Sequence, residues 1–144
     1  MTEANSMRRW MILCEAEGIN RRSATGQFLK EMDRFRVDQY NPMIGVGRNY
    51  ELDSIDVHFN LRPLNDSETV LQSLAVVNPA SGEGTKAMEI ICTFADRCKV
   101  ILLLDAAPYE SNHATPMPKA KLVQWYTRFG FVAEDGTTMR RVPK

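Results

Sequence analysis

A loop with two glycines is the first segment of this chain whose residue types could do chemistry. It reads Ser81-Gly82-Glu83-Gly84-Thr85-Lys86 and separates the apolar run 74–77 from a stretch with helical periodicity. Glycine lets the backbone approach a ligand, and the free N–H groups of a helix's first turn attract an anion. Lys86 would add a positive charge there. The segment predicts a phosphate-binding loop, although an ordinary strand-to-helix turn has the same composition.

An aromatic helix near the C-terminus is the second candidate. Gly130 is suited to end this helix, whose apolar side chains follow the i, i+3, i+4, i+7 spacing of one face: Leu122, Trp125, Tyr126 and Phe129. Such a stripe is ordinarily core, in which case Tyr126 is a packed residue. Its phenol, with an ordinary pKa of about 10, could also donate a proton to a leaving group.

Together, the two segments resemble the GNAT superfamily of acetyl-CoA-dependent N-acetyltransferases. The resemblance covers residues 68–142 and rests on Val76-Val77-Asn78-Pro79, on Gly82-x-Gly84 before a helix, and on Tyr126-x-x-x-Gly130-Phe131. It implies a GNAT-like α+β fold: a mixed, mostly antiparallel sheet flanked by helices, with a splayed central pair of parallel strands. It also implies direct transfer of an acetyl group from acetyl-CoA to an amine acceptor.

The resemblance assigns roles to individual residues. Tyr126 becomes the general acid that protonates the leaving thiolate, and Leu74 and Val76 become contacts of the pantetheine arm. The remaining coenzyme contacts are the glycine loop and one lysine: Ser81, Gly82, Glu83, Gly84, Thr85, Lys86 and Lys119. Ser81 stands where the family usually has Arg or Gln, and Lys86 where it usually has Gly or Ala. Counting back from the tyrosine to the family's frequent asparagine reaches Lys119.

The general base has several candidates. His58 lies on the polar face of an alternating strand, and imidazole is the side chain that changes charge near neutral pH. A lone histidine there is more often a surface residue. Glu68 begins the next strand, Asp105 ends the apolar strand over 100–104, and a water chain could replace all three.

Two other classes of function fit the same motifs. Glu83 in an anion loop favours a catalytically inactive GNAT-like protein that binds a partner or coenzyme A. A nucleobase-modifying GNAT-like transferase has one hint, an arginine cluster that a solvated face also explains: Arg8, Arg9, Arg21, Arg22, Arg34 and Arg36. Expected partners are acetyl-CoA and an amine-bearing small molecule or protein, with no membrane. A homodimer stays open, and nucleic acid lacks support.

Composition agrees with a single domain over 1–144, with N-terminal helices over 7–40 and a cofactor-binding core over 54–142. The chain is 44% apolar and 25% charged, and its formal net charge of zero provides no global field for nucleic acid or membrane. No run reaches the roughly 20 apolar residues of a membrane span, so we expect a cytoplasmic protein. Three cysteines without metal-ligand spacing predict no metal site.

Hydrophobic patterning predicts the elements that position these residues. Helices are expected over 7–17, over 24–40 before Asn41-Pro42, after the glycine loop, and around Tyr126. Loops are expected over 43–53, which lacks a clear period, and over 106–118. Strands 55–61 and 69–77 are expected to form an antiparallel hairpin. A buried strand is expected over 100–104, parallel to strand 69–77. Strands 131–133 and 138–142 are expected to form a final hairpin around Asp135-Gly136.

Overall fold

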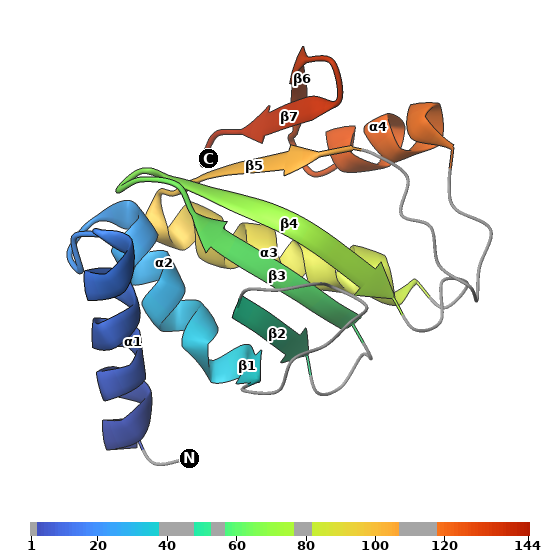
Figure 1. Cartoon of the computed structure of the whole chain (residues 1–144). Helices are drawn as coiled ribbons and strands as arrows, with labels where there is room; N and C mark the ends of the chain where they lie inside the picture. Colours follow the sequence, from blue (N-terminus) through green and yellow to red (C-terminus); the bar gives the residue numbers. More distant parts are fainter. Residues whose placement is uncertain (1–2, 38–47, 53–56, 77–81, 107–117) are drawn as a thin grey trace.

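The computed structural model of this chain describes residues 3–37, 48–52, 57–76, 82–106 and 118–144. Within these ranges seven strands form one sheet in the order β1-β2-β3-β4-β5-β7-β6 (Figure 1). The strands are β1 (Arg36–Val37), β2 (Arg48–Leu52), β3 (Val57–Pro63), β4 (Glu68–Val76), β5 (Ile101–Asp105), β6 (Val132–Asp135) and β7 (Thr138–Arg141). The helices are α1 (Glu3–Glu17), α2 (Ala24–Met32), the 3-10 helix η1 (Asp33–Phe35), α3 (Glu83–Cys98) and α4 (Lys119–Thr127).

The pairing of the strands confirms the predicted architecture. β4 and β5 are parallel and are joined by α3, whereas the other neighbouring strands pair antiparallel. The turn between β3 and β4 is closed by Asn65, whose side-chain oxygen accepts hydrogen bonds from the backbone N–H groups of Ser67 and Glu68, both at 2.9 Å. The fold is therefore α+β, with a mixed and mostly antiparallel sheet.

The parallel pair is splayed, and a β-bulge explains why. The β4–β5 ladder runs from Glu68 with Ile101 to Leu71 with Leu104, but β4 continues to Val76. On its other side, β4 pairs Ser73 and Leu71 with consecutive residues of β3, so Gln72 is an extra residue. A bulge bends its strand and increases the local twist. β4 consequently turns away from β5, and Figure 1 shows the two strands diverging toward their C-terminal ends.

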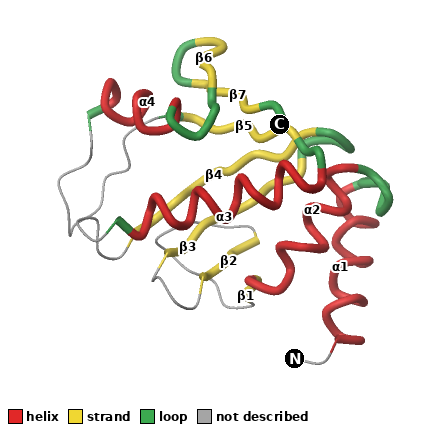
Figure 2. The backbone as a smooth tube through the Cα atoms, turned by 180° about the vertical axis from the view of Figure 1, so that it is seen from behind, coloured by secondary structure: helices red, strands yellow, loops and turns green. Residues whose placement is uncertain are grey.

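The core lies on one face of the sheet, beneath α2 and α3. Figure 2 shows α3 crossing β3 and β4 on that face. α3 buries Ala87, Met88, Ile91, Cys92 and Ala95, which recur every three or four residues and so lie on one face of the helix. The strands contribute alternate residues to the same cluster, among them Tyr50, Phe59, Leu61, Leu71, Leu102 and Met139.

α1 packs on α2 and forms a second, smaller cluster of Trp10, Leu13, Cys14, Ile19 and Leu29. The Trp10 indole N–H donates to the Gly26 carbonyl oxygen at 2.8 Å. A Cβ at Gly26 would collide with the backbone oxygen of Asn20, so this close approach requires glycine. No helix of the described ranges is long and apolar enough to cross a membrane.

Two sequence predictions were wrong around residues 33–53. The helix expected over 24–40 ends at Met32, because Asp33 is buried and its carboxylate accepts two hydrogen bonds from Arg9, at 3.2 and 3.0 Å. The chain then continues as η1 and β1, which pairs with β2. β2 itself lies in the segment expected as a loop, and it buries Tyr50 and Leu52. Tertiary contacts thus override local helical periodicity here.

The C-terminal hairpin is fastened to α3 by a buried arginine. Arg141 is only 2% exposed, and its guanidinium donates to both carboxylate oxygens of Asp96, each at 2.9 Å. These hydrogen bonds hold the pKa of Asp96 below its usual range. The Arg141 Nε also donates to the Phe129 carbonyl oxygen at 2.6 Å, so one side chain joins β7, α3 and the end of α4.

Removing the acidic partner should destabilise the fold strongly. We expect Asp96→Ala to lower the free energy of unfolding by about 3 kcal/mol, because it leaves a buried guanidinium without its counter-charge. Glu31→Ala is the control, since it breaks the exposed ion pair with Arg34 and should cost less than about 1 kcal/mol. Urea denaturation of both variants measures the difference, and equal effects would contradict the anchoring role.

Candidate functional site

The predicted site residues gather at the end of the sheet where β4 and β5 diverge. Both views place the first turn of α3 and the whole of α4 at this end (Figures 1 and 2). β3 begins here as well, since Val57 pairs with Val76 at the end of β4. Three kinds of group therefore meet at one end: a strand edge, a helix N-terminus and the side chains of α4.

The second half of β4 offers backbone groups on its β5 side. Beyond Leu71 these groups have no ladder partner among the residues that the structure describes. An open strand edge of this kind can pair with an extended ligand that carries amides. Leu74 lies in this half, half-buried and opposite Phe59 of β3, and Val76 is its last residue.

The N-terminus of α3 follows directly along the chain. Gly82 is its N-cap, with φ +78°, a left-handed conformation that favours glycine. The amide N–H of Lys86 bonds to the Gly82 carbonyl oxygen at 3.4 Å. The N–H groups of Glu83, Gly84 and Thr85 precede that bond, so the geometry of a helix leaves them without an intrahelical acceptor. The first turn therefore presents donors to an anion.

The charges of this first turn oppose each other. Lys86 and Thr85 are exposed, Gly84 is buried, and Glu83 is half-buried. A carboxylate in the first turn of a helix is favourable to the helix dipole, but it repels a second anion. Lys86 supplies the compensating positive charge. Ser81 lies outside the described residues.

Tyr126 lies on α4 and packs against aromatic neighbours. Its ring meets those of Trp125 and Phe131 edge to face, with centroids 5.0 and 5.8 Å away. Desolvation raises the pKa of Tyr126 to about 12. The phenol therefore keeps its proton at neutral pH, although it releases that proton less readily than an ordinary tyrosine would. Lys119, at the start of the same helix, is exposed.

His58 lies on β3 beside the free half of β4, where it pairs with Ala75. Its Nδ1 is 3.9 Å from a carboxylate oxygen of Glu51 on β2. Glu51 was not among the predicted site residues, because the segment 43–53 lacks a clear hydrophobic period and was expected to be a loop. The available signal was the short alternation of polar Glu51 between the apolar residues Tyr50 and Leu52, both of which are buried.

Glu68 does not join this group. It begins β4, so it lies eight residues from Val76, or about 26 Å along an extended strand. Its carboxylate accepts hydrogen bonds from Asn65 at 2.6 Å and Arg140 at 2.7 Å, and these lower its pKa. The placement and the ion pair indicate a structural role. Asp105 ends β5 at the diverging end and is exposed.

Half of the N-terminal arginine cluster is engaged within the chain. Arg9 pairs with Asp33 at 3.0 Å, Arg34 pairs with Glu31 at 2.7 Å, and Arg36 lies 3.9 Å from Asp33. Arg8, Arg21 and Arg22 are exposed. The cluster therefore splits into structural ion pairs and separate surface charges, which weakens the argument for a nucleic-acid surface.

No protein-family model matches the chain, and no curated protein sequence does. Two solved structures are similar to it. The anti-CRISPR protein AcrVA5 has a TM-score of 0.48 and 18% identity, over 66% of this chain and 98% of that one. Ard1 from Thermoplasma volcanium has a TM-score of 0.44 and 16% identity, over 63% of this chain and 65% of that one. The α+β fold with a crossover helix and a splayed parallel pair is established by the chain's own strand order and pairing.

The high pKa of Tyr126 can be tested by alkaline titration. The fold favours the neutral phenol, so its stabilisation is present below the unfolded pKa of about 10 and is lost as pH rises toward about 12. The absorbance difference between the wild type and Tyr126→Phe should show no phenolate near pH 10. A half-titration near pH 10 would mean that water reaches this ring freely.

Proposed function

We propose that this chain is an N-acetyltransferase that moves an acetyl group from acetyl-CoA to an amine. One observation carries the proposal: the described pairing of β4 with β5 ends at Leu71, beside the bulge at Gln72, and the rest of β4 leads toward the first turn of α3. An amide-bearing arm and a pyrophosphate are joined in one cosubstrate, coenzyme A. A strand edge followed by a helix N-terminus suits both parts in that order.

The cosubstrate would be held mainly by backbone groups. The edge of β4 around Leu74 and Val76 pairs with the pantetheine arm. The N–H groups of Glu83, Gly84 and Thr85 bind the pyrophosphate, and Gly82 shapes the turn. Two positive charges, on Lys86 and Lys119, offset the phosphates and the Glu83 carboxylate. Ser81, outside the described residues, is a further proposed contact.

The chemistry follows from what the side chains can give and accept. Acetyl-CoA supplies an acetyl group activated as a thioester. A C–N bond to the acceptor amine forms as the C–S bond breaks, and Tyr126 gives its proton to the departing sulfur. His58, whose Nδ1 lies 3.9 Å from a carboxylate oxygen of Glu51, takes the proton that the amine loses.

A second candidate is a GNAT-like protein that binds coenzyme A or a partner without transferring an acetyl group. The half-buried carboxylate of Glu83 in the proposed anion-binding turn favours it, as does the raised pKa of the Tyr126 phenol. Coenzyme binding without release of free thiol over a broad set of amines would select this candidate.

Calorimetric titration with acetyl-CoA tests the binding site. We expect micromolar binding by the wild type and at least a hundredfold loss in Gly84→Val, because a branched side chain there crowds the first turn of α3. Thr93→Val introduces the same side chain at an exposed position of the same helix and should leave affinity unchanged. Equal affinities in a folded Gly84→Val variant would place the coenzyme elsewhere.

Release of free thiol tests the role of Tyr126. With acetyl-CoA and a panel of spermidine, free lysine and a peptide with an unblocked N-terminus, Tyr126→Phe should lower turnover by about a hundredfold. Coenzyme affinity should stay within about twofold. Tyr50→Phe removes a hydroxyl from a core tyrosine and serves as the control. Unchanged turnover in Tyr126→Phe would remove the residue from the acid role.

A further inference from the structure

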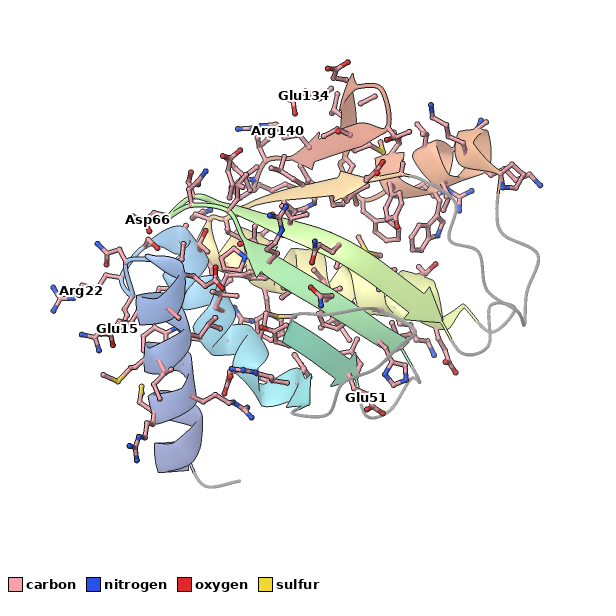
Figure 3. The ribbon with its side chains drawn as sticks, in the orientation of Figure 1. Glu15, Arg22, Glu51, Asp66, Glu134 and Arg140 are labelled. Carbon is pink, nitrogen blue, oxygen red and sulfur yellow. The ribbon has the colours of Figure 1, made fainter. Side chains whose placement is uncertain are left out.

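The outer face of α1 carries an apolar patch that nothing in the described part of the chain covers. Met11 is 39% exposed and Ile12 is 58% exposed, so both are exposed large apolar side chains within the described ranges. They form one stripe with the exposed Arg8 and Glu15, because positions 8, 11, 12 and 15 are spaced i, i+3, i+4, i+7. The opposite face of α1 buries Trp10, Leu13 and Cys14 against α2. Figure 3 shows Glu15 on the outer side of the helix.

This stripe is symmetric about the point between Met11 and Ile12. Turning the helix end over end about that point exchanges position 8 with 15, 11 with 12, and 7 with 16. Two copies of α1 packed antiparallel about a two-fold axis would thus bring Arg8 of one chain to the partner's Glu15, twice. Beside the two-fold axis, Met11 would meet the partner's Met11 on one side and Ile12 would meet the partner's Ile12 on the other. A parallel pairing would instead bring like charges together.

We propose that α1 is the contact surface of a homodimer in which two α1 helices pack antiparallel. The two charged side chains fit this role because neither Arg8 nor Glu15 has an ion pair within the described residues. They lie seven residues apart, or about 10.5 Å along one helix, which is too far for them to pair with each other. The second copy supplies both missing counter-charges at once.

A hollow beside α1 adds a second fit. It has a volume of about 400 Å³ and is lined by Met11, Glu15, Ile19, Asn20 and Arg21, at the C-terminal half of the helix. In an antiparallel pair, the partner's first helical turns lie over this half. Met7 is 40% exposed, and its flexible thioether chain suits an irregular hollow. The partner's Met7 is therefore the side chain that the hollow receives.

The contact is small and separate from the candidate site. α1 has 15 residues, so it is about 22 Å long, and a pair of such helices falls at the low end of interface sizes. We therefore expect a monomer–dimer equilibrium with a Kd of tens of micromolar, on the order of −6 kcal/mol. α1 and α4 lie at opposite ends of the molecule in Figure 1, so the inference does not depend on the proposed function.

Sedimentation velocity of the full chain between about 1 and about 300 µM tests the dimer. Arg8→Glu and Glu15→Arg should each weaken self-association by at least about tenfold, because each places two like-charged contacts in the interface. The double variant Arg8→Glu/Glu15→Arg restores opposite charges and should return the Kd to within about threefold of the wild type. Ile12→Glu should abolish the dimer.

Mixing the two single variants gives the sharpest readout. Arg8→Glu and Glu15→Arg chains complement each other at both ends of an antiparallel pair, so the mixture should dimerise at concentrations where each variant alone is mostly monomeric. Unchanged melting curves would show that all chains are folded. A wild type that stays monomeric at about 300 µM would overturn the proposal. A dimer that ignores both charge reversals would overturn it too.

Discussion

The arrangement of this molecule depends on how far β4 can pair with β5. Hydrogen bonding between the two strands covers four residue pairs and stops where Gln72 is inserted opposite β3. An inserted residue cannot be absorbed without bending its strand, and β4 is held to β3 on its other side. The bend therefore moves β4 away from β5. The β5-side edge of β4 opens in the half of the strand that leads into α3.

Packing turns that local irregularity into a stable feature. The paired half of β4 is anchored by buried side chains such as Leu71, which contacts the same cluster as Leu102 and Leu104. The unpaired half keeps its register through Phe59, which stacks on Tyr50 with centroids 5.3 Å apart. The core thus supports β4 along its length, while part of one backbone edge has no strand partner among the residues that the structure describes.

Much of this fold could be predicted from the sequence, because in several segments the local residue pattern alone indicates the type of element. The alternation around Phe59, the apolar run of β5 and the Asp135-Gly136 turn each led to the correct element. The end of α2 could not be read in the same way, since the buried carboxylate of Asp33 depends on Arg9, 24 residues away. The bulge at Gln72 has no local signature either, because it exists only relative to the register of β3.

For the candidate site, the sequence predicted which residues lie in the first turn of α3 and on α4. It could not predict that Glu68 lies far from them, or that Glu51 lies near His58, because both facts depend on the pairing of the strands.

The guanidinium of Arg141 has a consequence for how α3 and α4 are positioned relative to each other. It donates hydrogen bonds to the Asp96 carboxylate on α3 and to the Phe129 carbonyl oxygen just after α4, three residues beyond Tyr126. Asp96 lies near the C-terminal end of α3, so this one cation connects the helix whose first turn is the proposed anion-binding turn with the end of the helix that carries Tyr126. The position of α3 relative to α4 therefore depends on a residue that is not itself among the proposed coenzyme contacts.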